Sequence, residues 1–444
     1  MKSSRDCEPF GPTSSSEQSN RLSRRQMLKG VTGALGMAGV AAVTSDAQAI
    51  TSHKPAAVTS PEDYWQKWAT QLEDHRLIRV EPLQLPLRWP RLVGKNARLD
   101  NHGYGPRQDL VLLETDRGVR GWGLGWLGQQ PKEESQRILA QVKGKPLSEL
   151  YQMESGISAA CPRPLDFSMH DLVGQIVGQP VYALVNPKLV ERQPEPVPCY
   201  SGMIYFDDLE DEAYPPGSPH GVDRVVANAI ADYQAGYRQL KIKIGRGHRW
   251  MAPNKGMERD VEITKAIHSA LPDVTLLVDA NDGYDLATSK AYLENVADVP
   301  LLWFEEPFRE NVADCKELKQ FMEKQARKTY LADGEASPDQ ELLTKLMQQK
   351  AIDVYLTDIA ELGFTLWRSK IRELQDLQVL ASPHAFGSQL KTYYIAHLAA
   401  ALGNVLTIEG VPCRSDAIDW NGYALSMDGG LVPPVKHGFG MILK

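Results

Sequence analysis

Acidic side chains recur in the second half of the chain, each at the end of a short apolar run typical of a buried strand. Asp279 ends one run, Glu305 follows the next, and Glu335 follows the one after that. Carboxylates at adjacent strand ends converge, and they repel one another strongly unless a cation lies between them. Oxygen ligands without His or Cys suit Mg²⁺. We therefore predict that these three residues hold Mg²⁺ as the cofactor.

Candidate bases lie at neighbouring predicted strand ends. Lys241 and Lys243 are two residues apart on one predicted strand, so their side chains share a face. Two adjacent ammonium groups lower each other's pKa, which makes one of them a usable base near neutral pH. Asp358 and His384 end two adjacent strands, where the carboxylate fixes the imidazole tautomer and raises its basicity. These residues indicate proton transfer.

The elements that must position these residues alternate regularly between strand and helix patterns. This alternation favours an α/β fold with a parallel (β/α) TIM-type barrel, in which chemistry lies at the strand C-termini. A doubly wound sheet is the alternative, but residues 201–204 are not its glycine-rich phosphate loop. The predicted strands are Val197–Met203, Gln239–Ile244, Val274–Asp279, Leu301–Phe304, Thr329–Ala332, Ile352–Leu356, Val379–Ser382 and Val405–Ile408, and the predicted helices are Val222–Ala235, Met257–Leu271, Leu286–Ala297, Lys316–Ala326, Gln340–Gln349, Leu366–Leu377 and Leu390–Leu402.

The first half of the chain has a different pattern. Pro61–Glu73 is predicted as a short helix, and Arg79–Leu87 and Asp109–Thr115 as antiparallel strands followed by a glycine turn. Residues 132–184 carry helical patterns. We therefore predict an N-terminal α+β domain.

The N-terminus is predicted to be a targeting segment. Ser23–Lys29 contains a pair of arginines, an apolar stretch follows at Gly30–Val43, and Ala47–Ala49 offers a small-residue cleavage site. This order is typical of a twin-arginine signal peptide over residues 1–49, with a disordered basic tail as the alternative. The apolar stretch is too short for a membrane span. We expect an exported, periplasmic protein without stable membrane anchoring, whose mature chain begins near Ile50.

Composition narrows the class of partner. The net charge is −7 and no basic block stands out, which argues against nucleic acid. The five cysteines show no CxxC spacing, so a thiolate zinc site is not expected. We predict buried thiols, with one disulfide as the alternative in an oxidising compartment.

Five motifs occur in order along the predicted barrel: Lys241–Gly245, Val278–Asn281, Trp303–Pro307, Ala332–Glu335 and Ser382–His384. They resemble the enolase superfamily, and the strand-two lysine with the strand-seven histidine is similar to its mandelate racemase subgroup. The resemblance runs from about Arg79 to the C-terminus, and with it we expect a capping domain at 79–195, a barrel at 196–425 and a C-terminal segment at 426–444 that returns to the capping domain. The polar, proline-containing composition after the signal peptide predicts a linker, at 50–78.

The resemblance also implies roles for the candidate residues. Asp279, Glu305 and Glu335 would bind Mg²⁺, which stabilises the enediolate formed when a substrate loses the proton next to its carboxylate. Lys243 would be the base on one face and His384, held by Asp358, the base or acid on the other. Lys241 would hold the substrate carboxylate, and Glu409 would hydrogen-bond an enediolate oxygen.

Some positions depart from the family pattern. Asp333 is an alternative to Glu335 as the third metal ligand, and Ala360–Thr365 replaces a usual double glycine. Two insertions, Asp207–Pro219 and Arg246–Gly256, follow the first two barrel strands, where they either close the pocket or are solvated surface loops.

The expected substrate is a small carboxylate, and the expected activity is that of a lyase that dehydrates an acid sugar to a 2-keto-3-deoxy acid. Racemisation or epimerisation of a 2-hydroxy acid is the first alternative, and a non-catalytic sugar-acid binding protein is the second. Basic residues Arg91, Lys95 and Arg98 would suit a polyhydroxylated or second-carboxylate substrate, with solvated surface charge as the alternative. Relatives imply a homo-oligomer as a further possibility.

Overall fold

The computed structural model describes residues 60–335 and 338–444. The predicted signal peptide and the first part of the predicted linker lie outside these ranges. Within them, no helix is long and apolar enough to cross a membrane.

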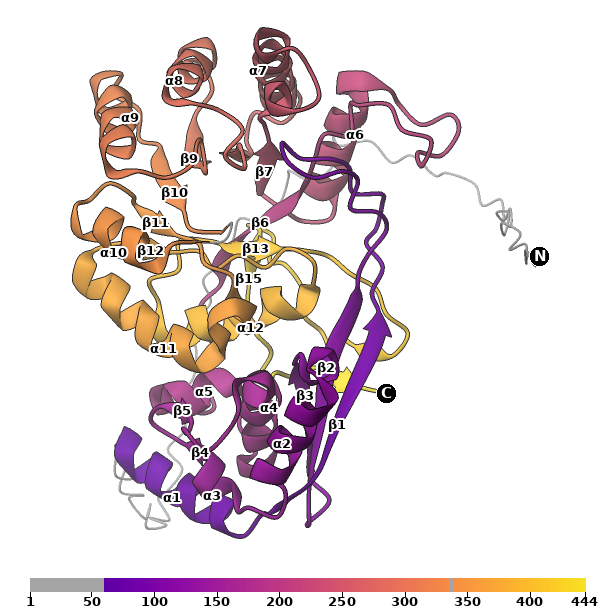
Figure 1. Ribbon diagram of the computed structural model, residues 1–444, viewed down its shortest axis with the longest axis vertical. Helices are drawn as coiled ribbons and strands as arrows, with labels where there is room; N and C mark the ends of the chain where they lie inside the picture. The colour runs from indigo at the N-terminus through magenta and orange to yellow at the C-terminus, as the bar shows by residue number, and fades with distance from the viewer. Residues whose placement is uncertain (1–59, 336–337) are drawn as a thin grey trace, which may run out of the picture. The chain divides into compact units, whose positions relative to one another are not determined.

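A barrel of eight parallel strands forms the second part of the described chain (Figure 1). The strands are β6 (Val197–Ile204), β7 (Gln239–Lys243), β8 (Thr275–Asp279), β9 (Leu301–Glu305), β10 (Tyr330–Asp333), β11 (Val354–Tyr355), β12 (Leu380–Ala381) and β13 (Ile408–Gly410). Strands β6 to β12 neighbour one another in chain order, and β13 pairs with β6. A parallel bridge between Ala381 and Val405 closes the ring, which confirms the predicted barrel.

Seven helices connect consecutive strands, as the periodicity predicts. They are α6 (Gly221–Gln234), α7 (Pro253–Ala270), α8 (Leu286–Asn295), α9 (Val312–Lys324), α10 (Gln340–Gln348), α11 (Ile359–Leu377) and α12 (Gln389–Leu402). Helix α7 begins inside the predicted insertion Arg246–Gly256, because Pro253 suits the first turn of a helix. Helix α11 begins earlier than predicted, since the side chain of Asp358 caps it by accepting from the amide of Ala360.

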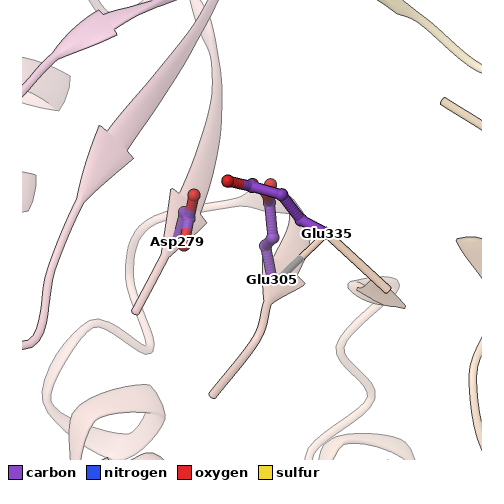
Figure 2. A group of neighbouring side chains, drawn as sticks. All are labelled: Asp279, Glu305 and Glu335. Carbon is purple, nitrogen blue, oxygen red and sulfur yellow. The ribbon is translucent and has the colours of Figure 1, made fainter. Parts of the chain in front are cut away.

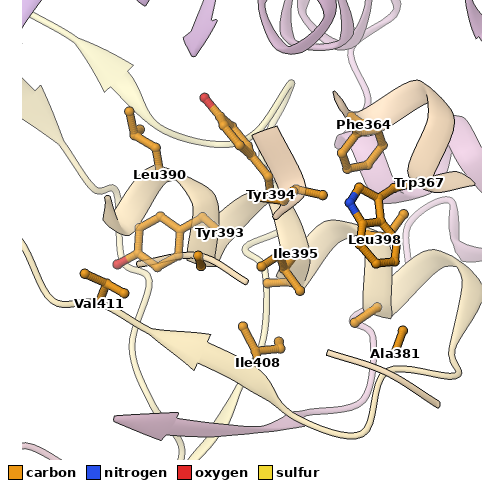
Figure 3. Close-up of a cluster of buried hydrophobic side chains, with 14 of the residues drawn as sticks. Phe364, Trp367, Ala381, Leu390, Tyr393, Tyr394, Ile395, Leu398, Ile408 and Val411 are labelled. Atoms are coloured by element: carbon orange, nitrogen blue, oxygen red, sulfur yellow. The ribbon is translucent and has the colours of Figure 1, made fainter. Parts of the chain in front are cut away.

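The apolar faces of the last two helices pack on the barrel strands. Figure 3 shows Trp367 of α11 and Leu398 of α12 in one cluster with Ala381 of β12 and Ile408 of β13, all buried. Burial of one large apolar side chain contributes about 1.5–3 kcal/mol. This packing holds the last strand ends, which carry His384 and Glu409, in a rigid frame.

The N-terminal domain is an antiparallel sheet with helices on it, as predicted. Its elements are α1 (Pro61–Glu73), β1 (Leu77–Pro86), β2 (Arg107–Thr115), β3 (Arg120–Leu124), α2 (Lys132–Val142), α3 (Leu147–Leu150), β4 (Tyr151–Gln152), β5 (Gly156–Ile157), α4 (Asp166–Val177) and α5 (Val181–Val185). Helix α1 falls in the range expected as a linker, yet it buries Trp68 and Leu72 against this domain. That part of the linker prediction is wrong, because an amphipathic helix with two buried residues is part of a core.

Buried hydrogen bonds join the N-terminal domain to the barrel. Asp166 of α4 accepts from the amide and the hydroxyl of Thr365, just after a kink in α11. The kink is at Gly363, whose φ of +77° suits glycine. Asp171 accepts from the amides of Trp122 and Phe439, and so ties the sheet to the C-terminal segment. The chain after β13 carries β14 (Ile418–Asp419), β15 (Gly430–Leu431) and β16 (Ile442–Leu443).

Candidate active site

The three predicted metal ligands come together at the ends of neighbouring strands. Asp279 ends β8, Glu305 ends β9, and Glu335 follows β10 by two residues. Ligand oxygens of the three lie within 4.8 Å of one another, and Figure 2 shows the side chains converging. Asp279 and Glu305 are buried.

The carboxylates of this set repel one another in this arrangement. Burial raises the pKa of Glu305, and the charge of Asp279 raises it further. Among the described residues, one oxygen each of Glu305 and Glu335 is buried without a hydrogen-bond partner. Buried acceptors without donors are costly, and a hard cation relieves that cost.

The geometry favours Glu335 over Asp333 as the third ligand. Asp333 ends β10 but does not join the convergent set. Burial raises its pKa, and so do the nearby charges of Glu306 and Glu310. It therefore belongs to a second group of buried acids beside the first.

The two lysines of β7 lie against the carboxylates. Lys241 Nζ is 2.8 Å from Glu305 Oε1 and 3.3 Å from Asp279 Oδ2, and Lys243 forms an ion pair with Asp279. Burial lowers the pKa of Lys243, but Asp279 and other neighbouring charges raise it, and the net shift is upward. Lys241 lowers the pKa of Lys243, as predicted, but the carboxylates outweigh this effect in these contacts.

The predicted imidazole–carboxylate pair is present on the other side of the site. His384 Nδ1 is 2.8 Å from Asp358 Oδ2, which fixes the tautomer, and Nε2 is 3.2 Å from Glu335 Oε1. Burial lowers the pKa of His384, yet Glu335 and the other nearby carboxylates raise it overall, as predicted. Glu409 of β13 lies 3.5 Å from Lys241 Nζ and 3.8 Å from His384 Nε2. The eight predicted residues thus form one connected cluster.

Lys391 is a member of this cluster that the sequence did not reveal. Its Nζ lies 2.6 Å from Asp358 Oδ2, the same oxygen that faces His384. Burial raises the pKa of Asp358, but Lys391 and His384 lower it to about 2. Lys391 lies on a helix rather than at a strand end, so a prediction based on strand ends does not find it.

The loop between β1 and β2, residues 87–106, which we call the capping loop, reaches the barrel and is fixed there by ion pairs. Arg91 pairs with Asp232 of α6 at 2.5 Å, and Arg98 pairs with Asp282 at 2.9 Å. Lys95 lies 3.3 Å from Asp211. Each of these three basic residues is therefore paired with an acid, and Arg91 and Lys95 are half-buried.

The two predicted insertions hold the same loop. Asp207 accepts from the amide of Gly94, and the indole of Trp250 donates to the carbonyl of Asn96 at 2.7 Å. Arg246 is completely buried and pairs with Asp208 and Asp260. These contacts favour a closing role for the insertions over that of solvated loops.

Two aromatic side chains at the site were not singled out from the sequence. Tyr205 directly follows β6, with Lys243 Nζ 5.5 Å from its ring centre. His102 of the capping loop lies 4.9 Å from Tyr205 between ring centres. Burial lowers the pKa of His102; Lys243 lowers it further and Glu335 raises it.

The four described cysteines, Cys161, Cys199, Cys315 and Cys413, are buried free thiols, as the main prediction has it. Burial raises the pKa of each thiol. None of these four takes part in the site or in a disulfide.

A parallel barrel with acids and bases gathered at its strand ends is typical of enzymes. Residues 224–444 match the family model described as Enolase C-terminal domain-like. The chain belongs to the enolase superfamily, and its relatives are enzymes.

The chain is similar to a galacturonate dehydratase from Geobacillus sp. that was solved with D-galacturonate and 5-keto-4-deoxy-D-galacturonate. The two are 29% identical and superpose with a TM-score of 0.73. The match covers 84% of this chain and 95% of that one. A mutant of it was solved with Mg. The D-xylonate dehydratase of Haloferax volcanii is 24% identical over 75% of this chain and 82% of its own. The N-succinylamino acid racemase of Thermus thermophilus is 36% identical over 52% of this chain and 56% of its own.

Proposed function

We propose that this enzyme removes the proton next to the carboxylate of an acid sugar and expels the β-hydroxyl, which yields a 2-keto-3-deoxy acid. One observation carries the proposal: a set of three carboxylates lies between Lys243 on one side and the His384–Asp358 pair on the other. The C–H bond next to a carboxylate is weakly acidic, so breaking it requires both charge stabilisation and a positioned base, and this arrangement offers both.

The donor set fits Mg²⁺. Asp279, Glu305 and Glu335 supply oxygens from three strand ends, and two of these oxygens are buried without a partner among the described residues. The two lysines now offset part of the carboxylate charge. When bound there, Mg²⁺ would supply the positive charge that stabilises an enediolate.

The chain's own groups would handle the protons. One of Lys243 and His384 takes the α-proton, and the electron pair of the broken C–H bond forms the enediolate. Expulsion of the β-hydroxyl together with a proton from the acid on the other side releases water and leaves an enol, which becomes the 2-keto acid. Lys241 would hold the carboxylate, and Glu409 would hydrogen-bond an enediolate oxygen.

Relatives support dehydration. Counted from its carboxylate, the 5-keto-4-deoxy-D-galacturonate bound to the Geobacillus enzyme has its keto group on the adjacent carbon and its deoxy position on the next. This is the pattern of a 2-keto-3-deoxy acid. Racemisation or epimerisation is the second candidate, favoured by bases on two sides of the site and by racemase relatives.

Proton NMR in D₂O of the Mg²⁺-loaded protein with a panel of acid sugars and 2-hydroxy acids tests the proposal. The panel includes D-galacturonate and D-xylonate, with lactate and mandelate as simple 2-hydroxy acids. Accumulation of a 2-keto acid supports dehydration, whereas deuterium at the α-carbon without a new product supports racemisation. Protein that binds Mg²⁺ and the acid sugar but gives neither result would favour the binding-protein alternative.

We also propose that the protein is exported as a folded enzyme. The support is the paired-arginine segment Ser23–Lys29 with the apolar stretch after it. Cell fractionation of the native chain and of a variant with Arg24 and Arg25 both changed to Lys tests this. Equal periplasmic amounts of the two proteins would argue against the twin-arginine route.

A further inference from the structure

Three aromatic rings lie across the site between its two bases. Ring centres of His102, Tyr205 and Phe386 are 4.9 to 5.3 Å apart in each pairing. Tyr205 lies beside Lys243, and Phe386 follows His384 by two residues. The cluster therefore extends from the lysine side of the site to the histidine side, and His102 brings the capping loop into it.

The polar atoms of His102 and Tyr205 have defined hydrogen-bonding roles. Nδ1 of His102 is 2.8 Å from the carbonyl of Gly94, an acceptor, so Nδ1 carries a proton. Burial lowers the pKa of His102 despite that hydrogen bond, and Lys243 lowers it further, which favours the neutral ring with Nε2 as an acceptor. Burial raises the pKa of the Tyr205 hydroxyl, which stays a donor.

Within residues 60–335 and 338–444, neither Nε2 of His102 nor the hydroxyl of Tyr205 has a hydrogen-bond partner. The rings of His102 and Tyr205 are adjacent, and an acceptor and a donor that both lack a partner suit a group that both donates and accepts, which is the property of an alcohol. A carboxylate would meet the lone pair of the neutral imidazole and be repelled. Arg91 and Arg98 of the capping loop, which could attract one, are paired with Asp232 and Asp282.

We propose that His102 and Tyr205 form a subsite that binds an uncharged hydroxyl group of the substrate, away from its carboxylate. The inference rests on the proposed function and narrows its substrate class to acid sugars with a free hydroxyl beyond the reacting carbons. His102 and Tyr205 act here as specificity-determining residues. The proton transfers stay with Lys243 and His384.

Matched substrates and ring-preserving variants test this subsite. The probes are D-galacturonate and its analogues that each lack one hydroxyl, at C2 or at C3, or the corresponding analogues of whichever acid sugar of the panel reacts fastest. Loss of one good hydrogen bond costs about 0.5–1.5 kcal/mol, so we expect kcat/KM to fall by about threefold to tenfold for one deoxy analogue with the native enzyme. In Tyr205→Phe and in His102→Phe, which keep the rings, that deoxy penalty should become smaller, because each variant has already lost one of the two hydrogen bonds.

Trp250→Phe is the matched control. It removes one hydrogen bond that holds the capping loop, from Trp250 to Asn96, but leaves His102 and Tyr205 in place. We expect it to slow the parent sugar and the deoxy analogue equally, and so to keep the penalty. A deoxy penalty that is undiminished in both ring variants, or that is absent from the native enzyme, overturns the subsite. If the native enzyme reacts with no acid sugar at all, the proposed function fails first and the subsite fails with it.

Discussion

Separate replacement of Glu335 and Asp333 tests which acid of this segment holds the metal. Glu335 shares the convergent set with Asp279 and Glu305, whereas Asp333 faces other buried acids. Burial raises the pKa of Glu335, but His384 and Lys243 lower it overall, so this carboxylate is charged. Burial and its acidic neighbours raise the pKa of Asp333 well above its usual range, which favours the neutral acid.

The expected difference follows from charge. A carboxylate and a doubly charged cation about 4 Å apart attract by about 8 kcal/mol at an effective dielectric constant of about 20. A loss of about one third of that, about 2.7 kcal/mol, corresponds to about a hundredfold in affinity. We therefore expect Glu335→Gln to weaken Mg²⁺ binding by about a hundredfold or more. Asp333→Asn replaces a neutral group by one of equal size, so we expect less than about a tenfold change.

Isothermal titration calorimetry with Mg²⁺ at one pH and ionic strength measures both variants. Circular dichroism first establishes that each variant is folded, since a loss of structure would lower metal affinity indirectly. Native affinity in Glu335→Gln, or an equal loss in the two variants, would refute the assignment of the third ligand and the electrostatic reasoning behind it.

Three further predictions concern catalysis and stability. Lys243→Ala and His384→Asn should each slow α-proton exchange by about 10²–10⁴-fold in the NMR assay, and native rates in either would contradict the two-base site. Arg246→Met removes the ion-pair partner of the buried Asp260 and leaves the buried Asp208 with only its longer pair to Arg259, and should lower the free energy of unfolding in urea by about 3–5 kcal/mol. The exposed pair of Arg249 with Asp100 makes Arg249→Met the control, expected to cost less than about 1 kcal/mol; equal costs would count against the buried pair. Gly363→Ala would place a Cβ against Asp166 at a positive φ, so calorimetry should show a lower Tm from a cost above about 1 kcal/mol, whereas an unchanged Tm would show that the kink tolerates a side chain.

The strand-end residues could be predicted from the sequence because a barrel brings every strand C-terminus to one face. A residue such as Asp279 or Glu409 needs only its position in an alternating pattern to be placed there. The choice between Asp333 and Glu335 could not be made that way, since both follow the same strand and their separation depends on the turn at Gly334, whose φ is +113°. The upward pKa shift of Lys243 likewise depends on its contact with Asp279, which spacing along one strand does not reveal.

Long-range pairing explains what the sequence could not reveal about the capping loop. Arg91 and Asp232 are 141 residues apart, and Arg98 and Asp282 are 184 apart, so no local pattern connects them. Each of these two arginines is paired with an acid of the barrel. The positive charge they carry therefore has a structural role. That charge attaches the loop to the barrel, and the loop then meets the site through the neutral ring of His102. Because the loop meets the site through a neutral ring and not through a cation, we expect it to select substrates by their hydroxyl groups. A second carboxylate on the substrate should therefore bring no gain in binding.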